Sequence, residues 1–411
     1  MTPVYFSKSV KTVIKLSQWF FLACCVGTLA GVGSAVLLAT LNGATKWRET
    51  HGWAIALLPL AGWVSGWMYD RWGKSIEAGN NLLLEEIHNP TATIPLRMAP
   101  MILLGTTLTH LFGGSAGREG TALQISASLG DSLTRVFRLK SADRRMVLMA
   151  SLSGGVASVF GTPLAGTIFG LEVLTVGTIR HVALFPCLIA AIVGDRVTLS
   201  LGLSHTGYRH APSLPVLTPT VLVSAIAAGI VFGLTAMTFA TLTHWVSQVF
   251  KSRIIYGPER TAIGGLIVAG IMLTIGTTTY SGLGIPTIVR AFEEPLPPWD
   301  FVGKIGLTAL TIGSGFKGGE VTPLFFIGAT LGNALSSVLA LPLPLLAGMG
   351  FVAVFGGAAN TPIAATLMGI ELFGAESGVF MAIACVMSYL CSGQAGIYRS
   401  QRLEESGKYP H

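Results

Sequence analysis

Apolar runs broken by short polar or glycine-rich segments fill most of this chain. The runs 19–41, 53–69, 181–203 and 221–246 are about as long as a membrane-spanning helix, which needs about 20 apolar residues. The segments 78–88, 147–160 and 164–176 are apolar but too short to cross. The pattern therefore predicts an all-α polytopic membrane protein in which many helices cross only half of the membrane.

Composition supports a membrane protein. The 411 residues are 51% hydrophobic and 11% charged, whereas about 25% of a soluble domain is charged. The net charge of +7 lies in tails and short loops, which indicates membrane topology and not nucleic-acid binding. Lys8, Lys11 and Lys15 predict a cytoplasmic N-terminus. The five cysteines show no metal-ligand spacing, so we expect no metal and no cofactor.

The two halves of the chain share landmarks in the same order. The run that begins at Pro163 and ends at Glu172 recurs from Pro362 to Glu371, so the offset is 199 residues. Glu119 and Thr121 match Glu320 and Thr322 at an offset of 201, and Gly79 matches Gly282 at 203. These offsets predict an internal duplication. If the first half crosses the membrane an odd number of times, the two repeats have opposite orientations in the membrane. Matching interrupted helices in the two halves then predict a binding site near the middle of the membrane.

The segment 113–121, Gly-Gly-Ser-Ala-Gly-Arg-Glu-Gly-Thr, is the leading site candidate. Its four glycines allow close backbone approach, and Glu119 stands where the next helix should begin. Helix N-termini attract anions, so Glu119 could occupy an anion site until a free anion displaces it or a proton neutralises it. The alternative is an acid that only stabilises the helix start. An ionisable residue inside a membrane favours a functional role.

Three further positions offer hydrogen-bond donors to an anion. Asn80 and Asn81 begin the short segment 78–88, and Thr322 follows the glycine-rich stretch 313–319. The phenol of Tyr398, which follows Gly396 near the C-terminus, could also donate to an anion. The alternatives are that Asn80 and Thr322 only cap helices and that Tyr398 anchors the chain at the membrane interface. Glu172 and Glu371, being duplicated, are better explained as scaffold. The match of 313–318 to G-x-G-x-x-G lies outside any βαβ unit and does not indicate a dinucleotide site.

At these motifs the chain resembles the CLC family of chloride channels and proton-coupled antiporters. The family's gating-glutamate motif is similar to Gly117-Arg118-Glu119-Gly120, and Pro163-Leu164-Ala165-Gly166 also matches. Three departures resemble the fluoride-exporting branch, the CLC-F fluoride/proton antiporters. They are Thr121 in place of proline, Gly79-Asn80-Asn81 in place of Gly-Ser-Gly, and Gly319-Glu320-Val321-Thr322-Pro323 in place of Gly-x-Phe-x-Pro.

The resemblance implies a role for each matched residue. Glu119 would be both gate and proton carrier, with Arg118 and Glu320 on the proton path or supporting it. We expect Glu320 to be neutral or hydrogen-bonded away from the anion. Val173 stands where chloride/proton antiporters have an internal proton-transfer glutamate. The expected anion-binding residues are Asn80, Asn81, Gly120, Thr121, Val321, Thr322 and Tyr398.

The resemblance also implies a CLC-like inverted-repeat fold with many tilted helices. We expect a single transport domain over 1–411, with repeats at about 19–203 and 218–398, a connector at 204–217 and no C-terminal regulatory domain. The expected protein is a homodimer in the inner membrane, with both termini cytoplasmic, that exchanges fluoride for protons. A chloride/proton antiporter or a passive anion channel of the same fold is the alternative. No nucleophile-and-base set supports an enzyme.

Overall fold

The structure is a computed structural model that describes residues 3–209, 211, 214–394, 396–404 and 408, with side chains from residue 12 onward. The described residues are mostly helical, in agreement with the all-α prediction. Four helical stretches among them are long and apolar enough to cross a membrane: Thr12–Thr50, His181–Ser200, Pro219–Arg253 and Gly257–Ile275. The α-helices are α1 Pro3–Thr50, α2 Leu58–Trp72, α3 Asn80–His88, α4 Met98–Leu111, α5 Glu119–Val136, α6 Ser141–Phe160, α7 Pro163–Glu172, α8 Leu184–Ser200, α9 Pro219–Arg253, α10 Gly257–Ile275, α11 Ile285–Arg290, α12 Asp300–Gly313, α13 Val321–Leu335, α14 Leu343–Ala359, α15 Pro362–Phe373 and α16 Gly378–Cys391.

Short 3-10 helices and one small sheet complete the fold. The 3-10 helices are Gly52–Leu57, Lys74–Ile76, His181–Ala183 and Ala375–Ser377. The strands β1 (Thr175–Val176) and β2 (Arg402–Leu403) pair in parallel, which attaches the polar tail to the end of the first half. This pairing was not predicted, because two-residue strands have no hydrophobic period to read.

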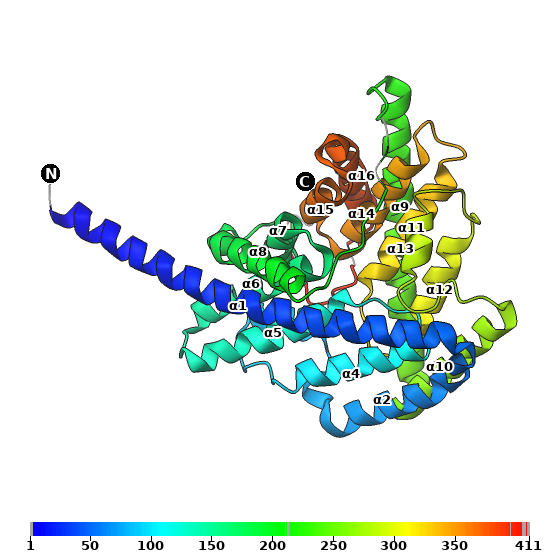
Figure 1. The fold of residues 1–411 in the computed structure, drawn as a ribbon, viewed down its shortest axis with the longest axis horizontal. Coiled ribbons are helices and arrows are strands. Elements are labelled where there is room, and N and C mark those ends of the chain that lie inside the picture. Colours follow the sequence, from blue (N-terminus) through cyan, green and yellow to red (C-terminus); the bar gives the residue numbers. More distant parts are fainter. Residues whose placement is uncertain (1–2, 210, 212–213, 395, 405–407, 409–411) are drawn as a thin grey trace.

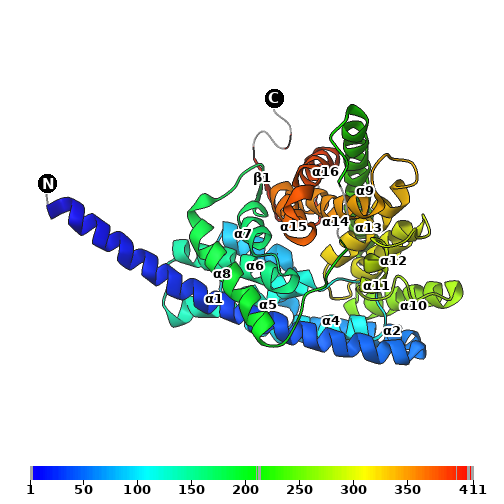
Figure 2. The same ribbon diagram turned by 45° about the horizontal axis from the view of Figure 1, so that its top comes forward.

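Helices of the second half repeat the packing of the first half. The neighbours α1–α8, α5–α6, α6–α7 and α1–α6 recur as α9–α16, α13–α14, α14–α15 and α9–α14. The halves meet through matched pairs, α2 with α10 and α7 with α15. This arrangement confirms the prediction of an internally repeated helical fold. In Figures 1 and 2, α1 lies along one side of the molecule and its first turns project away from the rest.

The helix breaks that follow α6 and α14 are built alike. Each helix ends on a left-handed residue, Gly161 (φ 72°) or Asn360 (φ 56°), and the next helix begins at Pro163 or Pro362. Glycine and asparagine tolerate this conformation, and proline suits a first helical turn. The short helices α7 and α15 follow from these local rules.

Several boundaries differ from the sequence prediction. Helix α1 is 48 residues long and continues past residue 41 to Thr50, because hydropathy marks the membrane-embedded part of a helix and not its end. The connector 204–217 has no helix among its described residues, yet Tyr208 packs against Phe292 and Phe351. The segment 135–145, which is rich in basic residues, contains the first turn of α6, where Arg144 is buried.

Candidate functional site

The starts of α5 and α13 face each other through two glycine-rich loops. The N–H of Gly117 donates to the carbonyl of Gly319 at 2.6 Å, and the N–H of Gly319 donates to the carbonyl of Gly117 at 2.7 Å. A Cβ atom on Gly319 would lie 2.8 Å from the nitrogen of Gly120, so only glycine fits there. Two helix N-termini therefore converge on one small volume, a setting that favours negative charge.

The Glu119 carboxylate occupies that volume. Its Oε2 accepts hydrogen bonds from the N–H of Thr322 at 3.0 Å and from the N–H of Arg118 at 3.1 Å. Its Oε1 accepts from the hydroxyl of Thr322 and lies 3.6 Å from Nε of Arg118. Glu119 is 1% exposed, so protein donors replace water around the carboxylate. A small free anion entering this place would need the same donors.

The short helix α3 brings Asn80 to the same region. Gly79 (φ 58°) turns the chain into the helix, and the amide of Asn80 packs against Gly120, where an added Cβ would lie 2.8 Å from Nδ2. Asn80 and Tyr398 line a small cavity of about 10 Å³ together with apolar side chains of α3, α5, α6 and α7. This volume suits a single water-sized particle.

Two residues that line this cavity each have a buried polar atom that makes no hydrogen bond to any described residue: Oδ1 of Asn80 and the hydroxyl of Tyr398. Buried polar atoms are nearly always satisfied by protein, water or an ion. A bound water or small ligand beside these two residues would satisfy both atoms.

Two alternatives for the asparagine and the threonine are wrong. Asn80 is the first residue of α3 and its side chain makes no capping hydrogen bond. Thr322 lies inside the first turn of α13 and donates its hydroxyl to Glu119 instead of capping its own helix. Tyr398 is buried, which excludes the role of an interfacial anchor.

Other predicted residues lie around the site with different functions. The Thr121 hydroxyl bonds to the Thr106 hydroxyl at 2.7 Å and is turned away from Glu119. The Asn81 oxygen accepts from the N–H of Ser400 at 3.1 Å, which ties the C-terminal segment to α3. Val321 is buried, and it reaches the site only through the backbone of its helix start.

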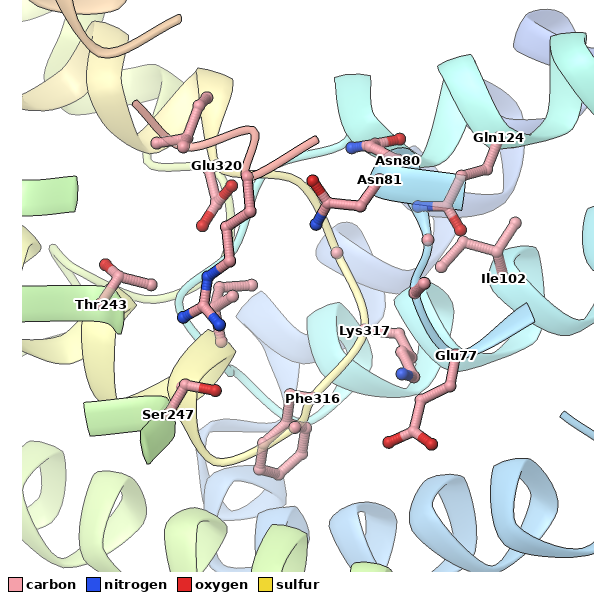
Figure 3. Close-up of a pocket in the computed structure, with 18 of the residues that line it drawn as sticks. Glu77, Asn80, Asn81, Ile102, Gln124, Thr243, Ser247, Phe316, Lys317 and Glu320 are labelled. Atoms are coloured by element: carbon pink, nitrogen blue, oxygen red, sulfur yellow. The ribbon is translucent and has the colours of Figure 1, made fainter. Parts of the chain in front are cut away.

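A larger pocket of about 250 Å³ adjoins the asparagines. Figure 3 shows Glu320, Asn80 and Asn81 in its upper part, with Lys317 and Glu77 below them. Arg399 and Tyr398 also line it, so the pocket joins three of the predicted anion-binding residues, Asn80, Asn81 and Tyr398, to a wider polar space.

Glu172 and Glu371 hold the scaffold behind the site. The Glu172 carboxylate accepts from the N–H groups of Ile363 and Ala364, at 3.0 and 2.8 Å, where α15 begins. The Glu371 carboxylate accepts from the N–H groups that follow Pro163 at the start of α7, at 2.9 and 2.8 Å. Each half therefore caps a helix of the other half, in agreement with the scaffold interpretation.

A buried ionic cluster that sequence reasoning missed fixes α3 against α5. Arg144 binds Asp131 through two hydrogen bonds of 2.8 Å and Glu86 through one of 2.8 Å. Glu86 is on α3 and Asp131 on α5, so Arg144 clamps the two helices whose first residues are Asn80 and Glu119. The cluster can be recognised only in the folded structure, where one guanidinium and two carboxylates that are distant in sequence come together.

Comparisons with known proteins agree with this geometry. A profile of the family described as "Voltage gated chloride channel" matches residues 61–393. A protein of Pseudomonas syringae pv. tomato (strain ATCC BAA-871 / DC3000) described as "Chloride/fluoride channel protein" is 53% identical over 397 residues, 95% of this chain and 88% of its own.

Solved structures share the whole fold. The crystal structure of a CLC-type fluoride/proton antiporter is 35% identical with a TM-score of 0.92, and the match covers 95% of this chain and 99% of that one. A slow cyanobacterial Cl⁻/H⁺ antiporter is 20% identical with a TM-score of 0.81 over 92% and 96% of the two chains, which is a likeness in fold.

Proposed function

Because the chain belongs to the voltage-gated chloride channel (CLC) family, we propose that it is a fluoride/proton antiporter that exports fluoride from the cytoplasm. The observation that carries the proposal is the Glu119 carboxylate, which is held by the N–H groups and the hydroxyl that a small anion would use. The identities of 53% and 35% to proteins described with fluoride, against 20% to a chloride antiporter of the same fold, support the choice of ion.

The geometry supplies a mechanism for exchange. While Glu119 is ionised, its carboxylate occupies the donors at the two helix starts and excludes a second anion. A proton on the carboxylate removes the charge that those donors stabilise, so the side chain can leave and an anion can enter. The Glu119 carboxyl therefore alternates between two states: protonated and outside the site, or ionised and blocking the site. Arg118 and Glu320 would assist that proton, as neighbours of the gate and of the pocket.

Fluoride holds its water tightly, so its site must replace several strong hydrogen bonds. The amide of Asn80 and the hydroxyl of Tyr398 belong to residues around a cavity that fits one small particle. The N–H groups at the α5 and α13 starts and the Thr322 hydroxyl are further donors, which now bind the Glu119 carboxylate. Chloride is larger and more weakly hydrated, and it gains less from these donors.

Asn80→Ser should lower the preference for fluoride over chloride by about 1–3 kcal/mol, the scale of one misplaced buried hydrogen bond. Paired measurements of fluoride and chloride efflux from liposomes would give the ratio. Asn89→Ser, at the exposed far end of α3, is the matched control. An unchanged ratio in folded Asn80→Ser protein would remove the asparagine from ion selection.

Thr322→Val keeps the side-chain shape and removes the hydroxyl that donates a hydrogen bond to Glu119. Loss of a hydrogen bond to a charged group corresponds to about 1.5–3 kcal/mol, so turnover should fall roughly 10- to 100-fold. Thr330→Val is the control, because that buried hydroxyl on the same helix donates to carbonyls of its own helix, those of Phe326 and Ile327. Wild-type fluoride efflux by Thr322→Val would exclude a role for the hydroxyl.

The remaining expectations about architecture also belong to this proposal. We propose a homodimer with one ion path per subunit, placed in the inner membrane with both termini in the cytoplasm. The repeats would span about 19–203 and 218–398 within one transport domain, and the matched helix packing of the two halves supports this division.

Liposomes loaded with fluoride test the function. Fluoride release down its gradient should drive protons into the liposomes, measured by a fluoride electrode and an external pH electrode. Fluoride release without proton uptake would instead favour a passive channel, which the description of the Pseudomonas relative makes the main alternative. Equal coupling with chloride-loaded liposomes would favour a chloride/proton antiporter.

A further inference from the structure

A groove of about 350 Å³ lies between α1 and the loop that joins α5 to α6. Its walls are mainly apolar and include Trp19 and Leu22 of α1 and Leu139 of the loop. Close by, Phe21 of α1 packs edge-on against Phe137, with ring centres 6.2 Å apart. In Figures 1 and 2, α1 passes α5 and α6 before its first turns leave the rest of the molecule. The groove therefore lies where the first helix separates from the other helices.

This groove is at one edge of the membrane-embedded part of α1. At about 1.5 Å per residue, the apolar run 19–41 is about 35 Å long, close to the hydrocarbon thickness of about 30 Å. The helical stretch Thr12–Thr50 is longer, so the turns before Trp19 extend into the headgroup region, where tryptophan is enriched. The lysines that precede Trp19 in the sequence indicate the cytoplasmic side.

Cations without ion-pair partners surround the groove. Lys15 lines it, and Arg138 and Lys140 flank Leu139 in the loop. All three side chains are exposed, and none forms an ion pair with a described residue. Asp143 is the acid among the residues that line the groove, so positive charge is in excess. Basic side chains beside a membrane attract anionic lipid headgroups.

The backbone of Arg138 shows that an arginine at this position has a cost. Helix α5 ends at Val136, and Arg138 then takes a φ of 50°, the left-handed conformation. The ends of α6 and α10 take the same conformation with glycine, Gly161 and Gly276. Glycine adopts it without strain, whereas a side chain with a Cβ atom does not. The arginine is therefore better explained by what its guanidinium binds than by the turn it forms.

We propose that this groove binds one anionic phospholipid. Its phosphate lies against Lys15, Arg138 and Lys140, and an acyl chain covers the apolar walls at Trp19 and Leu139. A zwitterionic phospholipid has the same phosphate, but its ammonium cancels the negative charge that the three cations attract. A free phosphate ion has no chain to fill the apolar walls. The lipid joins α1 to the α5–α6 loop, and this role does not depend on the ion that the protein transports.

Native mass spectrometry of the full-length protein in detergent tests the proposal, with phosphatidylglycerol and phosphatidylcholine as probes. Phosphatidylglycerol should bind more tightly than phosphatidylcholine of the same chain length. Lys15→Gln/Arg138→Gln/Lys140→Gln should weaken phosphatidylglycerol binding roughly 100-fold, because each cation near the surface contributes about 1 kcal/mol. Lys46→Gln, at an exposed position near the other end of α1, is the matched control and should keep the parent affinity.

Arg138→Gly separates a ligand contact from a structural role. Without lipid, the variant should melt at a higher temperature than the parent protein, because glycine relieves the left-handed turn. Its affinity for phosphatidylglycerol should nevertheless fall, and phosphatidylglycerol should raise its melting temperature less than it raises that of the parent. Equal binding of the two lipids, or full phosphatidylglycerol binding by the triple variant, would overturn the proposal. The same melting shift with inorganic phosphate alone would also overturn it, because the groove would then bind the anion without the chain.

Discussion

Replacing Glu119 by glutamine is expected to abolish proton movement and to leave fluoride either stalled or leaking without protons. Glutamine has nearly the shape of the protonated acid but cannot take up or release a proton. Its amide oxygen can still accept the hydrogen bond that the N–H of Thr322 now donates to the carboxylate. The variant should therefore fold normally while proton uptake falls to the level of empty liposomes.

The matched control for this change is Glu293→Gln, on an exposed loop before α12. It removes the same charge from a surface position and should keep the parent ratio of protons to fluoride. Normal proton-coupled export by Glu119→Gln would remove Glu119 from the mechanism and, with it, the main support for the proposed function.

The second large effect is expected on stability, from Arg144→Met. Removal of the guanidinium leaves the carboxylates of Glu86 and Asp131 buried without their cation. Breaking a buried ion pair from one side typically corresponds to about 3–5 kcal/mol. The temperature at which the detergent-solubilised protein loses its monodisperse peak in size-exclusion chromatography should fall by many degrees.

A charge-matched variant identifies the cause. Arg144→Met combined with Glu86→Gln and Asp131→Asn removes the unpaired charges and should recover part of the loss. Arg145→Met is the control, because Arg145 forms none of the ion pairs found in the described part of the chain. If Arg144→Met and Arg145→Met lowered stability equally, the cluster would not hold α3 against α5.

Much of the fold and of the site could be predicted from short stretches of the sequence. The start of α5 at Glu119 and of α13 next to Glu320 followed from glycine-rich loops placed before apolar runs. The meeting of these two helix starts followed in outline from the repeat, because matching helix starts in two halves must meet if both face one site. Short-range signals of this kind depend on a few neighbouring residues, so a single sequence contains them.

Features that depend on three-dimensional proximity could not be predicted. Arg144 stands among other basic residues in the sequence, and nothing nearby marks Glu86 as its partner. Thr121 looked like a neighbour of the anion, but its hydroxyl is bound to Thr106, because its place in the first turn of α5 directs it to α4. In both cases the contact depends on where one side chain points in the folded protein, and the hydropathy pattern does not contain that information.

Glu172 binds the start of α15 and Glu371 binds the start of α7, and this reciprocal capping has a consequence for how the protein is assembled in the membrane. While the ribosome is still making the second half, the first turn of α7 has no acceptor for the N–H groups of Leu164 and Ala165, because that acceptor arrives with residue 371. Backbone N–H groups inside a membrane need protein partners, so we expect α7 to reach its final state only after most of the chain has been inserted. A nascent chain truncated before Glu371 should therefore remain a substrate for membrane proteases.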